Sequence, residues 1–155
     1  MFFRKQILAG VISIVAATTT LAANVSVTGW NHTLLDSITS AGEYYPSTLE
    51  NELPSTASVN ITGLVADTDP WRLMASTSMA DINIAVQCSN AGTGNGTISG
   101  CNNYTTLTSS EQEIFRGTGN RSSIPLKFKI TNFDVTDGSG TKDIQIQYKV
   151  VVTPP

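Results

Sequence analysis

Short runs in which every second residue is apolar are the feature that most constrains this chain. The clearest runs cover residues 80–88, 124–130 and 143–152, and each places apolar side chains on one side of an extended backbone. A repeat of two residues predicts a β-strand with one buried face. The predicted inward residues are Ile82, Ile84, Val86 and Cys88 in the first run, Ile124, Leu126, Phe128 and Ile130 in the second, and Ile144, Ile146, Tyr148 and Val150 in the third.

Weaker runs at 24–30, 57–65 and 71–76 add further strands, and Gly63 is expected to mark a bulge in the second of them. The third run would place Trp71, Leu73 and Ala75 on its inward face. About seven short strands with little helix favour a single antiparallel β-sandwich of the immunoglobulin-like type. The Gly-containing turn at 137–140 predicts that 124–135 and 143–152 form a hairpin.

The segment between the cysteines and the last two strands is harder to assign. Ser110 and Glu113 have the spacing of a helix capping box, so a helical turn competes with a strand over 103–115. Residues 116–123 contain two glycines among polar residues and are expected to form a loop.

The first 23 residues have the pattern of a secretory signal peptide. Arg4 and Lys5 precede an apolar stretch at 7–17, which is shorter than a membrane span, and small residues follow it. We therefore expect an exported protein whose mature domain covers 24–155. An uncleaved anchor, a type IV prepilin and a lipid anchor fit less well. No later stretch could span a membrane.

The charge balance excludes some partners. The chain has 9 Lys and Arg against 12 Asp and Glu, and removal of Arg4 and Lys5 with the signal leaves seven basic residues and a net charge of −5. An acidic chain without a basic run is not expected to bind nucleic acid or anionic membranes.

Cys88 and Cys101 are the only cysteines, and both lie in the predicted mature domain. An even pair in an oxidising compartment predicts a structural disulfide that closes the loop of Gly, Asn, Ser and Thr residues between them. A redox-active pair would favour a C-x-x-C spacing, which is absent.

Residues suited to catalysis or metal binding are few. His32 is the single histidine, so a Ser-His-Asp site could use only His32, and no G-x-S-x-G turn occurs. A zinc site would need several His or Cys ligands, which one histidine and two paired cysteines do not supply. We predict no enzyme activity and no cofactor. Two groups of carboxylates leave weaker alternatives: a calcium site and a glycosidase pair. The first would use Asp67, Asp69, Asp134, Asp137 and Asp143, and the second Glu50 with Glu52 or Glu111 with Glu113.

Exposed aromatic rings could stack on a sugar ligand. Trp71 and Tyr148 have the inward parity of their strands and are expected in the core. The remaining candidates for a ligand-facing patch are Trp30, Tyr44, Tyr45 and Tyr104, among which Tyr44 and Tyr45 precede Pro46 in a predicted loop. Six Asn-x-Ser/Thr sequons occur, at Asn24, Asn31, Asn60, Asn95, Asn103 and Asn120, and the sequence leaves their glycosylation open.

In layout the chain resembles a fimbrial subunit, or pilin, of the chaperone–usher kind. The shared features are a signal peptide, a short alternating strand NVSVTGW at the new N-terminus, an all-β body with one disulfide and low charge, and a closing strand DIQIQYKVVVT. The resemblance implies that strand 24–30 of one subunit is inserted into the next, with Val25 and Val27 as donor-strand residues. It also implies copies of the chain, a periplasmic chaperone and an outer-membrane usher as partners, and location in a cell-surface filament.

The leading hypothesis is therefore a structural subunit of a surface filament, and it predicts an unpaired N-terminal strand in the single chain. The alternative is a secreted module that binds carbohydrate or protein through its exposed aromatic rings. An enzyme is the third and least favoured class.

Overall fold

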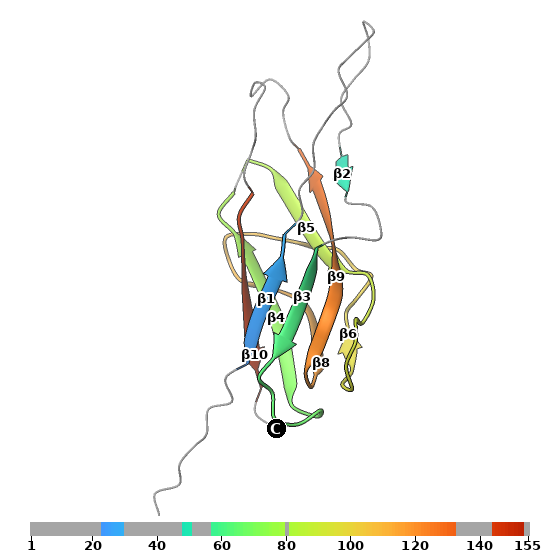
Figure 1. Cartoon of the computed structure of the whole chain (residues 1–155). Coiled ribbons are helices and arrows are strands. Elements are labelled where there is room, and N and C mark those ends of the chain that lie inside the picture. Colours follow the sequence, from blue (N-terminus) through green and yellow to red (C-terminus); the bar gives the residue numbers. More distant parts are fainter. Residues whose placement is uncertain (1–22, 30–47, 51–56, 80, 133–143, 154–155) are drawn as a thin grey trace, which may run out of the picture.

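The computed structural model describes residues 23–29, 48–50, 57–79, 81–132 and 144–153. Two antiparallel sheets lie face to face and form a sandwich (Figure 1). This confirms the predicted all-β sandwich. Ten strands occur in the described residues, and the seven that are at least five residues long match the expected number.

The larger sheet contains six strands in the order β1-β3-β9-β5-β7, with β2 paired to β9 beside this path. All its pairs are antiparallel. Its strands are β1 (Asn24–Thr28), β2 (Thr48–Glu50), β3 (Ser58–Thr62), β5 (Asn83–Cys88), β7 (Thr105–Thr106) and β9 (Arg121–Thr131).

The smaller sheet contains four strands in the order β10-β4-β8-β6. Its strands are β4 (Pro70–Thr77), β6 (Ile98–Ser99), β8 (Gln112–Thr118) and β10 (Ile146–Val152). Strands β10 and β4 pair over seven residues, from Ile146 opposite Thr77 to Val152 opposite Trp71.

The core fills the space between the two sheets, as the alternation predicts. The expected inward residues of β4, β5 and β9 are all buried, and those of β10 are half-buried and pack against the core. Trp71 is 1% exposed, and its indole Nε1 donates a hydrogen bond of 2.8 Å to the Gly119 carbonyl. Its ring meets Phe115 edge to face, with 6.1 Å between the ring centroids. The placement of Trp71 in the core is therefore confirmed.

The disulfide between Cys88 and Cys101 is present, with their Cα atoms 4.8 Å apart. Cys88 ends β5 and is fully buried, whereas Cys101 lies in the connection between β6 and β7. The bond therefore ties a polar loop, which contributes β6 to the smaller sheet, to a central part of the larger sheet.

The predicted hairpin of 124–135 with 143–152 is wrong. Strands β9 and β10 lie in different sheets, β9 beside β3 and β5 and β10 beside β4. The alternation correctly gave the inward face of both strands. It carries no information on which strand is the partner, and the predicted turn at 137–140 lies outside the described residues.

Residues 103–123 also differ from their prediction. The Ser110–Glu113 capping box does not start a helix, because Glu113 already belongs to β8. The predicted loop 116–123 instead holds the end of β8 and the start of β9, joined only by Gly119 and Asn120. These two residues take the chain from one sheet to the other.

The sharp corner at Gly119 depends on a residue without a side chain. Gly119 has a φ of 64°, and a Cβ there would lie 2.8 Å from the backbone of Asp67. The neighbouring Asn120 bonds both the N–H and the carbonyl of Leu64, each at 2.9 Å. The polar residues that suggested a loop thus satisfy the backbone of a packed corner.

The expected bulge at Gly63 lies elsewhere. The register between β3 and β9 shifts between Val59 and Ile61, whereas Gly63, with a φ of 86°, follows the last residue of β3. Gly63 therefore ends the strand.

Candidate functional site

The strongest candidate for a functional element is β1, which forms one edge of the larger sheet. Among the described strands of this sheet it pairs only with β3, in a register that runs from Asn24 opposite Thr62 to Thr28 opposite Ser58. On its other side it lies close to β10, the edge strand of the smaller sheet (Figure 1). The two sheets thus meet at this edge, and β1 covers it.

The side chains of β1 divide by parity as the sequence predicts. Val25 and Val27 are half-buried and pack against the core, whereas Asn24, Ser26 and Thr28 are exposed. On β3, Val59 and Ile61 are fully buried beneath this edge. Withdrawal of β1 would therefore uncover an apolar strip between β3 and β10, together with the unpaired backbone groups of β3.

One residue of β3 links β1 to the rest of the sheet. The Asn60 amide donates from Nδ2 to the Ser26 hydroxyl at 3.2 Å, and its Oδ1 accepts from the backbone N–H of Ser123 at 2.8 Å. The amide therefore bridges β1 and β9 across β3. Asn60 is also the asparagine of one of the six sequons, and these two hydrogen bonds occupy its side-chain amide.

The attachment of β1 to the body is modest in energy. Full burial of a valine side chain contributes about 1.5–3 kcal/mol, and both valines here are only half-buried. A short edge strand of this kind belongs to the parts of a protein that open locally before the whole fold unfolds.

The unpaired N-terminal strand that the filament hypothesis expects in a single chain is not what the structure has. Strand β1 pairs with β3 of the same chain. Sequence reasoning identified the strand and its two inward valines, but it missed the partner, because alternation alone does not identify the neighbouring strand.

The predicted aromatic patch receives little support from Tyr104. Its ring is half-buried, its hydroxyl is buried without a hydrogen-bond partner among the described residues, and the Lys129 Nζ lies 5.7 Å from the ring centroid. Burial, and secondarily the charge of Glu50, raise the pKa of Tyr104. Trp30, His32, Tyr44 and Tyr45 lie outside the described residues.

Tyr148 is half-buried on β10 and packs against the core, as its parity predicts. Burial raises the pKa of Tyr148, so its hydroxyl stays neutral at physiological pH. This ring is therefore part of the edge of the core that β10 covers.

Most of the described carboxylates that were proposed for chemistry have structural partners instead. Glu50 pairs with Lys129 at 3.2 Å, and Glu111 pairs with Lys149 at 3.0 Å. The Asp69 carboxylate accepts from two backbone N–H groups, those of Val65 at 3.1 Å and Ala66 at 2.8 Å, as an Asp in a turn commonly does. Glu52, Asp134, Asp137 and Asp143 lie outside the described residues. Within the described ranges, no three potential ligands gather to hold a metal ion.

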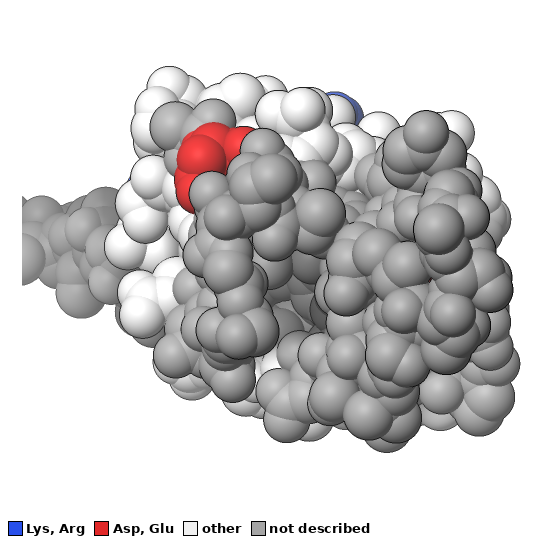
Figure 2. Space-filling model, turned by 90° about the horizontal axis from the view of Figure 1, so that it is seen from above, with Lys and Arg blue, Asp and Glu red and all other residues white. Residues whose placement is uncertain are grey.

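The described surface at one end of the sandwich carries little charge. Figure 2 shows mostly uncharged atoms among the described residues visible there, with a small acidic area and the edge of a basic residue. None of the described residues forms a helix that could cross a membrane.

Comparison with protein-family models, curated proteins and solved structures finds no match to this chain. The sandwich and its disulfide therefore rest on the structure itself, and the immunoglobulin-like and fimbrial relationships stay predictions.

Proposed function

We propose that the protein is a structural subunit of a cell-surface filament, in which β1 of one copy pairs with β3 of the next. The observation that carries this proposal is the position of β1. It begins the predicted mature chain and forms a sheet edge, it pairs with a single strand among the described residues, and its two inward valines are half-buried. An element attached in this way is suited to exchange between copies.

Exchange would reuse the contacts seen within one chain. A second copy offers the same β3 edge and the same apolar strip, so the register from Asn24 opposite Thr62 to Thr28 opposite Ser58 can form between chains. Nineteen residues, 29–47, separate β1 from β2, and an extended chain of that length spans roughly 65 Å. A contact of this head-to-tail type, repeated, generates an open filament.

Pairing within the chain competes with pairing between chains. A tethered strand has an effective concentration in the millimolar range, which favours the closed single chain in dilute solution. Assembly would therefore need a partner that holds the β3 edge open until the next copy arrives. The periplasmic chaperone and the usher implied by the fimbrial resemblance would serve that purpose.

A synthetic peptide of residues 23–29 tests whether β3 accepts a strand in trans. The full-length variant Val27→Asp should release its own β1, because a carboxylate in this half-buried apolar position costs about 1–3 kcal/mol. We expect the wild-type peptide to raise the melting temperature of this variant in a concentration-dependent way. Thermal unfolding followed by circular dichroism measures the shift.

Two matched controls make this experiment specific. The same peptide carrying Val27→Asp should not raise the melting temperature, and the exposed substitution Ser26→Asp in the peptide should matter far less. A folded Val27→Asp variant that ignores the wild-type peptide at millimolar concentration would contradict strand exchange.

A further inference from the structure

Two arginines stand directly opposite each other on the outer face of the smaller sheet. Arg72 on β4 pairs with Arg116 on β8 in the strand register, and both side chains are exposed. Like charges in this relation repel each other and destabilise a sheet unless something compensates them.

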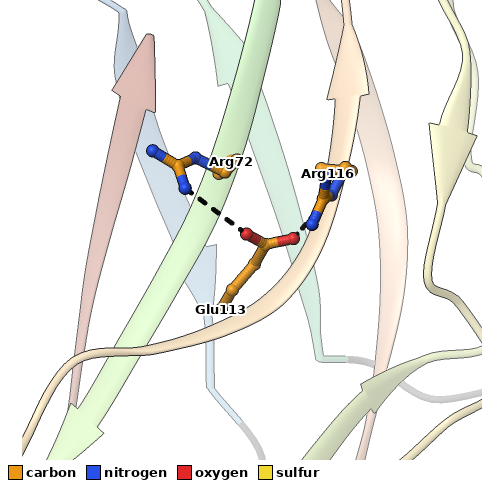
Figure 3. Close-up of polar contacts among 3 residues, drawn as sticks. All are labelled: Arg72, Glu113 and Arg116. Carbon is orange, nitrogen blue, oxygen red and sulfur yellow. Dashed lines mark hydrogen bonds and ion pairs between the residues drawn. The ribbon is translucent and has the colours of Figure 1, made fainter. Parts of the chain in front are cut away.

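Glu113 supplies part of the compensation, as Figure 3 shows. Its carboxylate lies between the two guanidinium groups, with Oε1 at 2.6 Å from the Nε of Arg116 and Oε2 at 3.8 Å from an Nη of Arg72. One carboxylate beside two guanidiniums leaves a net positive charge. A guanidinium has five N–H donors, and these contacts use few of them.

A shallow hollow of about 450 Å³ adjoins the arginines. In register, Ser99 of β6 continues the row formed by Arg72 and Arg116. A second row holds hydroxyl-bearing side chains and a proline. This row runs across the strands in the order Thr153, Pro70, Thr118 and Thr97. The Thr153 N–H donates to the Pro70 carbonyl, and Pro70 lies opposite Thr118 in the register. The Thr118 N–H donates to the Thr97 carbonyl. All of these residues line the hollow.

The hydroxyl groups on the second row keep capacity for a ligand. The Thr118 hydroxyl accepts from the Thr97 N–H at 3.0 Å, and the two threonine hydroxyls lie 3.3 Å apart. Each hydroxyl has one donor and two acceptor positions, so this pair can still bond an incoming hydroxyl. Thr153 is exposed at the end of β10.

We propose that this hollow binds an anionic saccharide. Planar guanidiniums hold carboxylate or sulfate oxygens with two parallel hydrogen bonds, and the neighbouring threonine and serine hydroxyls suit the hydroxyls of a sugar ring. The shared chemistry is an oxyanion on a hydroxyl-rich ligand. The site lies on the opposite sheet from β1 and does not rest on the filament proposal; in a filament it would be repeated and would bind multivalently.

Binding of defined tetrasaccharides to the folded full-length protein tests the proposal. Isothermal titration at low salt would use a heparin tetrasaccharide, which carries sulfate and carboxylate groups, a hyaluronan tetrasaccharide, which carries carboxylates only, and neutral maltotetraose. We expect binding of at least one anionic probe, weakening with salt, and no binding of maltotetraose. The two anionic probes distinguish sulfate from carboxylate as the recognised group.

The double variant Arg72→Gln/Arg116→Gln should bind the anionic probe at least tenfold more weakly. The matched control, Lys127→Gln/Lys129→Gln, makes the same charge change on the other sheet and should stay within about threefold of the wild type. Glu113→Gln removes a competing carboxylate and should strengthen binding severalfold, a result that loss of structure cannot produce.

Three results would overturn this site. They are failure of the wild type to bind either anionic probe, equal weakening in the arginine and lysine variants, and unchanged or weaker binding by a folded Glu113→Gln variant.

Discussion

Replacement of Trp71 by Ala is expected to lower the free energy of unfolding by about 3–5 kcal/mol. The ring is 1% exposed, packs edge to face on Phe115, and lies over Gly117, where an added Cβ would approach within 2.6 Å of the indole. Truncation leaves a cavity between the sheets and removes the donor to the Gly119 carbonyl. Urea denaturation of the signal-free protein measures the loss.

Two further substitutions separate volume from the hydrogen bond at Trp71. Trp71→Phe keeps much of the ring and should cost about 1–3 kcal/mol, mainly for the lost donor. Val65→Ala, at a side chain that is 85% exposed, should leave stability within about 0.5 kcal/mol of the wild type. A Trp71→Ala variant that loses less than about 1 kcal/mol would contradict the description of this core.

Removal of the disulfide by Cys88→Ala/Cys101→Ala should lower the free energy of unfolding by about 3 kcal/mol. The bond closes a loop of twelve residues that carries β6 and is otherwise rich in Gly, Asn, Ser and Thr. Alanine avoids placing a hydroxyl at the fully buried position 88. Equilibrium unfolding of the variant provides the measurement.

The wild type in excess reductant is the control for the disulfide, and it should unfold at nearly the same denaturant concentration as the double variant. If the double variant instead unfolds at the same denaturant concentration as the oxidised wild type, the disulfide does not stabilise the fold.

The sequence predicted which side of each strand faces the core much better than it predicted the neighbours of that strand. Ile82, Ile84, Ile124 and Leu126 are buried as their parity requires. The partners of β9 and β10 were missed, since alternation reports only on burial, and pairing depends on contacts between residues far apart in the chain.

The corner at Gly119 and Asn120 shows a second limit of sequence reasoning. Glycine and asparagine commonly mark loops, but here Gly119 provides a backbone conformation with positive φ and Asn120 bonds the backbone of Leu64. Asn120 and Leu64 are 56 residues apart, so the residues around either of them in the sequence do not reveal this contact.

The two candidate sites also combine features that the sequence could predict with features that it could not. Val25 and Val27 could be assigned to an N-terminal strand from their spacing, whereas the edge that they cover, between β3 and β10, required the structure. The juxtaposition of Arg72 and Arg116 also could not be predicted, because it depends on the register between β4 and β8, which shifts between Leu73 and Met74.

In the proposed filament, β1 leaves its own β3 and pairs with the β3 of another copy. Thr28 and Ser58 are directly opposite across this pair, so cysteines at both positions lie within reach of a disulfide. Single variants Thr28→Cys and Ser58→Cys are exported together, oxidised, and separated by size without reductant. A bond between these two variants can form only between chains.

We expect a cross-linked pair from the mixed variants, and a ladder of covalent multimers from the double variant Thr28→Cys/Ser58→Cys in assembled material. A double variant found only as a monomer with an internal bond, and mixed variants that never join, would contradict strand exchange and leave β1 as an ordinary edge strand of a closed sandwich.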